Sequence, residues 1–367
     1  MALFNITHGV ILIITNICRG LGNQMFRYAA GRALSLRYGC PLKLDTSWFS
    51  VFARNNNLFG ACTARQYLLP IFNLPCEIAT KEEINGFTQD NVGEYSTWLA
   101  NFNLWPEPLS CICVAKPKTP NYSQIKENTF SDTTLDSIGL DVYWEDFSNI
   151  TPPAYIHGNF LCERYFKDIR EQLIQDFAFP ELPPECLAIR DSITKYANSI
   201  SLHVRHGDYL VQDSIMGRKR FVVIDMDYYK KAIEYIIERV TDAVIFVFSD
   251  DMDWCREHIC TSGSPVIFVD LQSEQTCYHD MHLMSLCRHH IIANSTFSWW
   301  GAWISKESGI TCSPQQWYQE QTLCTITHQQ RDGFGLRTEV FTFHELNILF
   351  RTFLPAILVY TAFCAEE

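Results

Sequence analysis

The sequence predicts an α/β protein built from two Rossmann-like domains, and three observations support this fold class. The chain has 367 residues, which is too long for one ordinary hydrophobic core and suits two domains. Strand-like and helix-like segments alternate through its second half, a pattern typical of a doubly wound parallel sheet. Close to the N-terminus, an apolar run, a glycine turn and a helical segment together predict a β-α-β unit.

The first β-α-β unit contains a glycine-rich turn. Residues 10–17 are a β-branched run, which predicts a buried strand. After a tight turn at residues 20–22, Asn23 is the expected N-cap of a helix and Gly39 is its expected left-handed C-cap. Residues 41–45 then begin a second strand. The free N–H groups at such a helix start can bind phosphates and hydroxyls.

The middle of the chain is less regular. Residues 50–155 are rich in Asn, Pro, Thr and Trp, and we expect this variable region to face a substrate. A strand over 155–160 and an amphipathic helix over 162–177 follow, and Pro180, Pro183 and Pro184 then interrupt the pattern. We therefore expect an N-terminal α/β domain over residues 1–180, a second domain over 181–325, and an extension over 326–367 that is helical and packed back on the protein or associated with a membrane.

The second half of the chain alternates regularly between strands and helices. Strands are expected over 199–204, 243–249, 266–269 and 290–293, and helices over 228–240 (capped by Asp227), 252–259, 278–287 and 297–304. Ligands of such sheets bind beyond the carboxyl ends of the strands. Those ends are the most polar positions of this half, namely residues 205–208, 249–251, 270 and 294–298.

The charge of the chain excludes one class of partner. Its net charge is −12, which argues against the broad basic surface that tracks a nucleic-acid backbone. A small anionic ligand needs only a local basic cluster. Three such clusters occur: Arg19 with Arg27 and Arg32, residues 203–206, and residues 218–220. Each of them is as compatible with a solvated charged face as with a binding site.

Cysteine usage and hydropathy indicate the compartment. The 15 cysteines include no CxxC pair, so zinc ribbons and redox motifs are not expected, and most cysteines are predicted to be small buried hydrophobes in a reducing compartment. No export signal and no apolar run of membrane-spanning length are visible. We expect a cytoplasmic protein, in which residues 353–364 either pack on a domain or lie peripherally on the inner face of a membrane.

The segment His203-Val-Arg-His-Gly-Asp208 is the strongest chemical signal. An arginine at the end of a strand can bind two oxygens of a diphosphate and stabilise the charge that develops when a sugar leaves. Here Arg205 has that position, and His203 and His206 can donate hydrogen bonds to phosphate or ribose. An ordinary strand end with a salt bridge is the alternative for this segment taken alone.

A second segment, residues 293–303, joins a strand to an aromatic helix. The hydroxyls of Ser295, Thr296 and Ser298, with the backbone amides, form a candidate phosphate cradle at the helix start. The three tryptophans of this segment, Trp299, Trp300 and Trp303, are assigned to packing.

Two further motifs give weaker signals. The turn Gly20-Leu-Gly-Asn-Gln-Met25 suggests a dinucleotide fingerprint with Asp45 as the ribose-binding acid, but Met25 stands where the third glycine belongs. The run 249–253 contains closely spaced aspartates that could bind a metal ion. We favour the view that Asp251 and Asp253 are acids of a first helical turn, stabilised by the helix dipole, and we predict no metal site.

Taken together, these motifs resemble the galactoside α-1,2-fucosyltransferases, glycosyltransferase family 11. The resemblance rests on Gly20–Gln24, His203–Tyr209, Phe248–Asp251 and Ala293–Trp303, which stand in the family's order. Residues 158–166 and 225–233 are also similar, so that the resemblance covers residues 20–320 approximately.

The resemblance implies an inverting, metal-independent enzyme of GT-B type that needs no cofactor. Its donor would be GDP-β-L-fucose, bound by the domain over 181–325, and its acceptor the 2-hydroxyl of a terminal β-galactoside in an oligosaccharide or glycolipid. Arg205 would hold the pyrophosphate and Asp280 would face the guanine. The other implied contacts with the donor are Gly22, Asn23, His206, Asn294, Ser295, Thr296, Phe297 and Ser298.

One position departs from the family pattern, because His206 stands where a second arginine is usual. A neutral imidazole cannot bind a phosphate as a guanidinium does. Activity should survive if Arg205 carries the pyrophosphate, whereas donor affinity should fall or become pH-sensitive if the second position does. Arg205, Asp208 and His203 are the candidate catalytic residues. The base is open between Asp208, Asp213 and an acid of the first domain, and Asp208 has the alternative role of orienting Arg205.

Other functions remain open from the sequence. The same chemistry with another linkage or acceptor, such as α-1,6 or protein O-fucosyl transfer, depends on residues 50–155. A non-catalytic GDP-sugar-binding or lectin-like protein belongs to a different class, and an NAD-dependent oxidoreductase is the weakest alternative.

Overall fold

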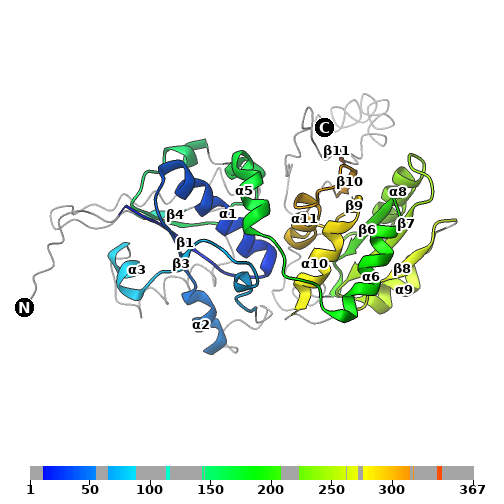
Figure 1. Cartoon of the computed structure of the whole chain (residues 1–367), viewed down its shortest axis with the longest axis horizontal. Coiled ribbons are helices and arrows are strands. Elements are labelled where there is room, and N and C mark those ends of the chain that lie inside the picture. The colour runs from blue at the N-terminus through cyan, green and yellow to red at the C-terminus, as the bar shows by residue number, and fades with distance from the viewer. Residues whose placement is uncertain are drawn as a thin grey trace, which may run out of the picture.

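The chain folds into two α/β lobes that lie side by side (Figure 1). In this computed structural model the described residues are 11–54, 65–87, 113–115, 143, 145–207, 223–261, 263–271, 276–314, 317 and 337–340. Each lobe contains one sheet whose strands are mainly parallel. The predicted α/β class with two Rossmann-like parts, the GT-B arrangement, is confirmed.

The first lobe has a five-stranded sheet in the order β3-β2-β1-β5-β4. Its strands are β1 (Ile13–Asn16), β2 (Leu42–Asp45), β3 (Glu77–Ile78), β4 (Cys113–Ala115) and β5 (Ala154–His157). Only β4 is antiparallel to its neighbour. The predicted β-α-β unit is present, because α1 (Leu21–Tyr38) joins β1 to the parallel strand β2.

The two ends of α1 differ in how well the sequence predicts them. Gly39 is left-handed at φ 59°, as expected of a glycine C-cap. The predicted N-cap is wrong: Gly20 is the N-cap and Asn23 lies inside the first turn. Gly20 offers no side-chain cap, and the Asn23 amide is instead directed at Thr296 of the second lobe.

The other helices of the first lobe surround this sheet. They are α2 (Ser47–Arg54), α3 (Lys81–Phe87) and α5 (Arg170–Asp176), with 3-10 turns η1 (Leu69–Ile71), η2 (Glu145–Asn149), η3 (Glu163–Tyr165) and η4 (Lys167–Ile169). The continuous helix predicted over 162–177 is wrong, since two 3-10 turns precede α5. Phe166 leaves the helical conformation (φ −144°, ψ 7°) and packs its ring against Trp300, so tertiary contact overrides the local helical pattern.

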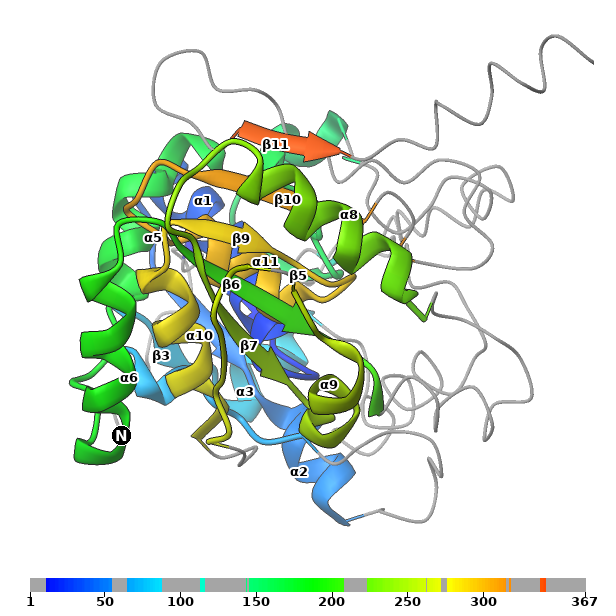
Figure 2. The ribbon, with the colours of Figure 1, turned by 90° about the vertical axis from the view of Figure 1, so that its right-hand side faces the viewer.

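The second lobe has a six-stranded sheet in the order β11-β10-β9-β6-β7-β8, with parallel pairing throughout (Figure 2). The strands are β6 (Ser199–Val204), β7 (Val244–Ser249), β8 (Val266–Phe268), β9 (His289–Ile291), β10 (Ile310–Ser313) and β11 (Arg337–Val340). The helices are α6 (Pro184–Lys195), α8 (Met226–Ile237), α9 (Met252–His258), α10 (Cys277–Leu286) and α11 (Thr296–Trp303). The predicted doubly wound parallel sheet is confirmed.

Two local predictions in the second lobe need correction. Asp225, not Asp227, is the N-cap of α8, because its carboxylate accepts the backbone N–H of Tyr228 at 3.0 Å while Asp227 lies in the first turn. Strand β11 lies in the extension predicted to be helical, where it pairs with β10. The rest of that extension, including residues 353–364, lies outside the described residues. The predicted domain limits at 180 and 325 stay predictions.

Successive side chains of the central strands lie alternately in two hydrophobic cores on opposite faces of the second sheet. Val244, Phe246 and Phe248 of β7 belong to the core that also contains α10 and α11 residues, whereas Ile245 and Val247 join the core beneath α8 and α9. In β6, Ile200, Leu202 and Val204 lie in the core beneath α8 and α9. Because successive residues of a strand point to opposite faces, His203 is directed to the α10–α11 face, where its ring lies 5.8 Å from that of Phe297.

A single aromatic core joins the two lobes. Phe26 of α1 packs against Trp299 and Trp300 of α11, with ring centroids 4.6 and 5.0 Å apart. Phe166 stacks on Trp300 at 5.5 Å and Phe177 meets it edge-on at 5.1 Å. The indole N–H of Trp300 donates to the carbonyl of Gly22 at 3.0 Å. The assignment of Trp299, Trp300 and Trp303 to packing is thus confirmed, since all three are buried.

One other expectation from composition can be checked within the described part of the chain. Ten free cysteines have side chains that the structure describes, and seven of these are buried, as expected of small hydrophobes. Among the described residues, no helix combines the length and apolar character that a membrane span requires.

We predict that Trp300→Phe destabilises the folded protein by about 1–3 kcal/mol, because it removes buried aromatic volume and leaves the Gly22 carbonyl without its donor. Urea denaturation monitored by circular dichroism measures this change. Tyr38→Ala, at a partly exposed position, is the control. Equal stability of Trp300→Phe and the wild-type protein would contradict the assigned role of the interlobe core.

Candidate functional site

The carboxyl edge of the second sheet brings most of the predicted site residues together. Strand β6 lies between β7 and β9, and the chain continues to β7 on one side and reaches β9 on the other. This reversal is a topological switch point, where open α/β sheets bind ligands. Arg205 follows β6 there, and Asn294 and Ser295 follow β9.

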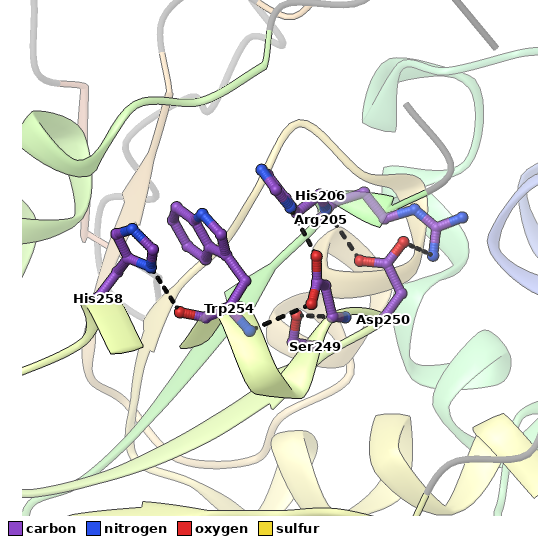
Figure 3. A network of polar contacts seen from close by, with 7 residues as sticks. Arg205, His206, Ser249, Asp250, Trp254 and His258 are labelled. Atoms are coloured by element: carbon purple, nitrogen blue, oxygen red, sulfur yellow. Dashed lines mark hydrogen bonds and ion pairs between the residues drawn. The ribbon is translucent and has the colours of Figure 1, made fainter. Parts of the chain in front are cut away.

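Arg205 is held by a carboxylate from the neighbouring strand (Figure 3). Its guanidinium Nη1 lies 3.3 Å from Oδ2 of Asp250, and both side chains are about one-fifth exposed. The other oxygen of Asp250 accepts the backbone N–H of His206 at 2.9 Å. Asp250 therefore fixes both the cation and the turn that carries it. Sequence reasoning did not select Asp250, although its place at the end of β7 and beside β6 was a usable signal.

His203 lies next to this cation as a neutral imidazole. Burial, reinforced by the nearby Arg205 guanidinium, lowers the pKa of His203 to about 3. Near neutral pH the imidazole carries no charge. His203 can therefore donate or accept one hydrogen bond at a ring nitrogen, and the positive charge at the end of β6 belongs to Arg205.

His206 points the opposite way from Arg205 (Figure 3). Its Nδ1 lies 2.8 Å from Oδ2 of Asp251, and its ring stacks on Trp254 with centroids 4.5 Å apart. The predicted contact between His206 and the donor stays a prediction, and the structure shows this side chain engaged with α9.

The start of α11 uses most of its hydroxyl groups for its own structure. The Ser295 hydroxyl accepts the N–H of Phe297 at 3.3 Å as a helix N-cap, and Ser298 donates back to the Ser295 carbonyl. Asn294 donates to the Trp317 carbonyl at 3.0 Å. The ring of Phe297 is half-buried beside His203 and can form an apolar wall there.

Gly22 and Asn23 lie against Thr296, at the contact between the lobes. A Cβ on Gly22 would come within 2.6–2.7 Å of the Thr296 backbone and hydroxyl. The Asn23 amide donates to the Thr296 hydroxyl at 3.4 Å. The glycine turn thus allows α1 to approach α11 closely, and this close approach explains the glycine whether or not a phosphate binds nearby.

Asp280, in the first turn of α10, is partly buried and partly protonated at neutral pH. Burial is the main cause and the charge of Asp270 adds to it, together raising the pKa of Asp280 to about 7. Within the described part of the chain, its Oδ1 is buried without a hydrogen-bond partner. Such an oxygen is ready to accept hydrogen bonds from a ligand that enters.

The aspartates after β7 serve structural roles. Asp251 is the N-cap of α9 and accepts the N–H of Trp254, while Asp253 in the first turn pairs with Arg256 at 3.0 Å. The described residues include no group of three or more His, Cys, Asp or Glu side chains placed to hold a metal ion. Asp208 and Asp213, the candidate bases of the second domain, lie outside the described residues.

The first lobe holds a buried polar network at the carboxyl ends of its central strands. Asp45 accepts hydrogen bonds from the Tyr155 hydroxyl at 2.7 Å and the Asn16 amide at 3.3 Å. Arg27 donates to Asn16 and, at 2.8 Å, to Asn159. Since Asp45 is wholly buried and bonded to its neighbours, it is not placed to bind a ribose, which removes the support for the dinucleotide interpretation.

Comparison with known proteins identifies the family. The model of glycosyl transferase family 11 matches residues 124–333, more than half of the chain. The chain belongs to glycosyl transferase family 11. An α-1,2-colitosyltransferase of Escherichia coli is 30% identical over 317 residues, which are 85% of this chain and 94% of that protein. The O-antigen biosynthesis glycosyltransferase WbnK of the same organism is 30% identical over 84% of this chain and 95% of its own length.

Mammalian relatives match a shorter part of the chain. Galactoside α-(1,2)-fucosyltransferase 1 of Rattus norvegicus is 30% identical over 169 residues, which are 44% of either chain. Among solved structures, the NodZ α-1,6-fucosyltransferase soaked with GDP-fucose aligns with a TM-score of 0.41 at 14% identity, covering 80% of this chain and 92% of that one.

We predict that Gly22→Ala disturbs the contact between the lobes. The added methyl must displace the Thr296 backbone, which costs about 1–3 kcal/mol of folding stability. Thermal unfolding detects the loss, and turnover should fall with it if the two lobes hold the substrates together. Gly86→Ala is the matched control, since a Cβ there meets nothing within 4 Å. An unchanged melting temperature for Gly22→Ala would count against the close approach.

Proposed function

We propose that this family 11 protein transfers L-fucose from GDP-β-L-fucose to the 2-hydroxyl of a terminal β-galactoside, with inversion to an α-1,2 linkage. The observation that carries the proposal is Arg205, a cation oriented by Asp250 at the switch point of the second sheet. A guanidinium there matches the charge of a diphosphate. The names of family relatives that form α-1,2 linkages support the same reaction.

The chemistry is a direct displacement at the anomeric carbon. The acceptor 2-hydroxyl oxygen forms a bond to C1 of fucose while the bond from C1 to the β-phosphate oxygen breaks. The leaving GDP takes that electron pair, and Arg205 stabilises the charge that develops on the β-phosphate. The proton of the acceptor hydroxyl goes to a carboxylate base. Asp208, Asp213 and an acid of the first lobe stay the candidates for this base, and no cofactor or metal ion takes part in the proposed step.

The donor nucleotide is proposed to lie along the carboxyl edge of the second sheet. Arg205 would contact the diphosphate, and Phe297 with the start of α11 would line the nucleotide. Asp280 would accept hydrogen bonds from the N1–H and amino group of guanine, for which its buried Oδ1 is suited. The galactoside, as an oligosaccharide or glycolipid, would approach from the first lobe.

A second candidate concerns the donor sugar. One relative of nearly full length is named for the transfer of colitose in α-1,2 linkage. Colitose is the 3-deoxy form of fucose, so a donor site for either sugar differs in how it treats one hydroxyl.

The alternatives with α-1,6 or protein O-fucosyl linkage, and a non-catalytic GDP-sugar-binding protein, are separated by the same assay. A cytoplasmic location and peripheral membrane contact also stay proposals.

We expect that incubation with GDP-fucose and lactose releases GDP and forms an α-1,2-fucosylated product, with equal yield in the presence of EDTA. Linkage analysis of the product by nuclear magnetic resonance checks the regiochemistry, and a parallel incubation with the GDP-linked 3-deoxy sugar compares the two donors. Arg205→Ala should lower turnover by at least about a hundredfold, because it removes the positive charge that stabilises the leaving GDP. A folded Arg205→Ala protein of wild-type activity would refute the role of Arg205.

We also expect GDP affinity to depend on pH through Asp280. Guanine offers hydrogen-bond donors, so binding requires the ionised carboxylate, whereas burial raises the pKa of Asp280 to about 7 and favours its protonated form. Affinity should therefore rise as the pH increases towards 7, by up to about tenfold per unit, and level off above it. Calorimetric titration with GDP from pH 5.5 to 8.5 measures this.

Asp280→Asn is the control for that titration, because it cannot ionise and should bind GDP weakly with less pH dependence. The free energy of unfolding supplies a second check. A carboxyl whose pKa is raised by folding holds its proton in the native state, so its contribution to stability is lost as the pH rises from about 4 to 7. An identical pH dependence of GDP affinity in the wild-type protein and in Asp280→Asn would exclude the proposed guanine contact.

A further inference from the structure

His206 and Arg205 are neighbours in sequence, but their side chains extend in opposite directions and contact different residues. Strand β6 directs Val204 into the core beneath α8 and α9 and His203 to the face of α11. Continuing the alternation, Arg205 follows the direction of His203, and His206 follows that of Val204. The structure agrees: the His206 ring reaches Trp254 of α9, while the Arg205 guanidinium extends the other way (Figure 3).

Two contacts attach the His206 side chain to the start of α9. Its Nδ1 lies 2.8 Å from Oδ2 of Asp251, and its ring is stacked on the Trp254 indole at 4.5 Å with 24° between the planes. The other oxygen of Asp251 accepts the Trp254 N–H at 3.2 Å, and the Asp251 N–H donates to the Ser249 hydroxyl at 2.9 Å. Nδ1 and one face of the imidazole are therefore occupied by residues at the start of α9.

Two consecutive aspartates, Asp250 and Asp251, connect His206 to Arg205. Asp250 accepts the backbone N–H of His206 through Oδ1 and pairs with Arg205 through Oδ2. Asp251, the next residue, holds the His206 side chain. The turn after β6 is consequently attached to β7 and α9 at its backbone and at both side chains, so displacement of His206 moves the point from which Arg205 extends.

We propose that His206 is a positioning residue: with Asp251 and Trp254 it anchors the turn that carries Arg205, and it does not contact the donor diphosphate. This inference rests on the proposed function of Arg205. It gives Trp254 and Asp251 the same anchoring role, because both contact the His206 side chain. It also explains how the chain accommodates histidine at the position of the family's second arginine. The single guanidinium of Arg205 then carries the diphosphate contact of this turn.

A double-mutant cycle between His206 and Trp254 tests the proposal. His206→Ala and Trp254→Ala should each weaken GDP binding and raise the KM for GDP-fucose by about five- to tenfold, because each releases the same turn. The double variant should be little worse than either single variant, since the anchor is already lost. Calorimetry with GDP and initial-rate kinetics give the two readouts, and kcat should change less than KM.

Matched variants separate positioning from general loss of stability. His206→Asn retains a donor near the position of Nδ1 and should recover part of the affinity lost in His206→Ala. Asp251→Asn should weaken GDP binding, whereas Asp253→Asn, two residues along the same helix and paired with Arg256, should leave it unchanged. If His206→Ala does not fold, His206→Asn combined with Trp254→Phe provides the cycle with smaller changes.

The outcomes are distinct. Additive losses in the double variant would show that His206 and Trp254 act independently, and this result would overturn the proposal. A loss for His206→Ala with none for Trp254→Ala and Asp251→Asn would show that His206 contacts the nucleotide itself, and it would also overturn the proposal. A wild-type protein that binds no GDP would overturn the proposed function, and this assignment with it. Normal GDP binding with strongly coupled losses supports positioning by His206 even if the acceptor proves not to be a galactoside.

Discussion

The contact between Gly22 and Thr296 is the constraint on which the arrangement of the two lobes depends. It brings the start of α1 onto the start of α11 with no room for a side chain on Gly22. The Trp300 indole then reaches the Gly22 carbonyl, and Phe26, Phe166 and the tryptophans of α11 fill the space around it. Both lobes therefore share one aromatic core, and the carboxyl edges of their sheets are held relative to each other by packing that any larger residue at position 22 would disturb.

Burial within the second lobe sets the charges of its polar groups. Burial keeps His203 neutral and holds Asp280 near its midpoint of ionisation, while Arg205 keeps its charge beside Asp250. In the proposed complex, the diphosphate would meet the oriented cation of Arg205. The guanine would meet the carboxylate of Asp280, whose Oδ1 has no hydrogen-bond partner among the described residues. Arranging charge in this way, with groups fixed before the ligand arrives, is the usual means by which proteins stabilise a leaving anion.

Much of the fold could be predicted because its signals are local. The run Ser199–Val204 is a strand over its predicted length, and Gly39 ends α1 in the left-handed conformation that glycine adopts readily. Two of the errors occurred where residues distant in sequence make contact. The Asn23 side chain contacts Thr296 and does not cap α1. Phe166 leaves the helical conformation and its ring stacks on Trp300. Asp250 was not selected as a site residue because its partner, Arg205, is 45 positions away in sequence.

By itself, the sequence determined the α/β class, the parallel second sheet and the segment at the end of β6 that carries the candidate cation, since strand alternation and turn residues are short-range properties of a chain. It even contained the directions of Arg205 and His206, because neighbours along a strand face opposite sides. Only the tertiary structure decided what each of them meets. Asp250, Asp251 and Trp254 come from the next strand and helix, and burial, which sets the charge of His203 and Asp280, exists only when distant segments pack together.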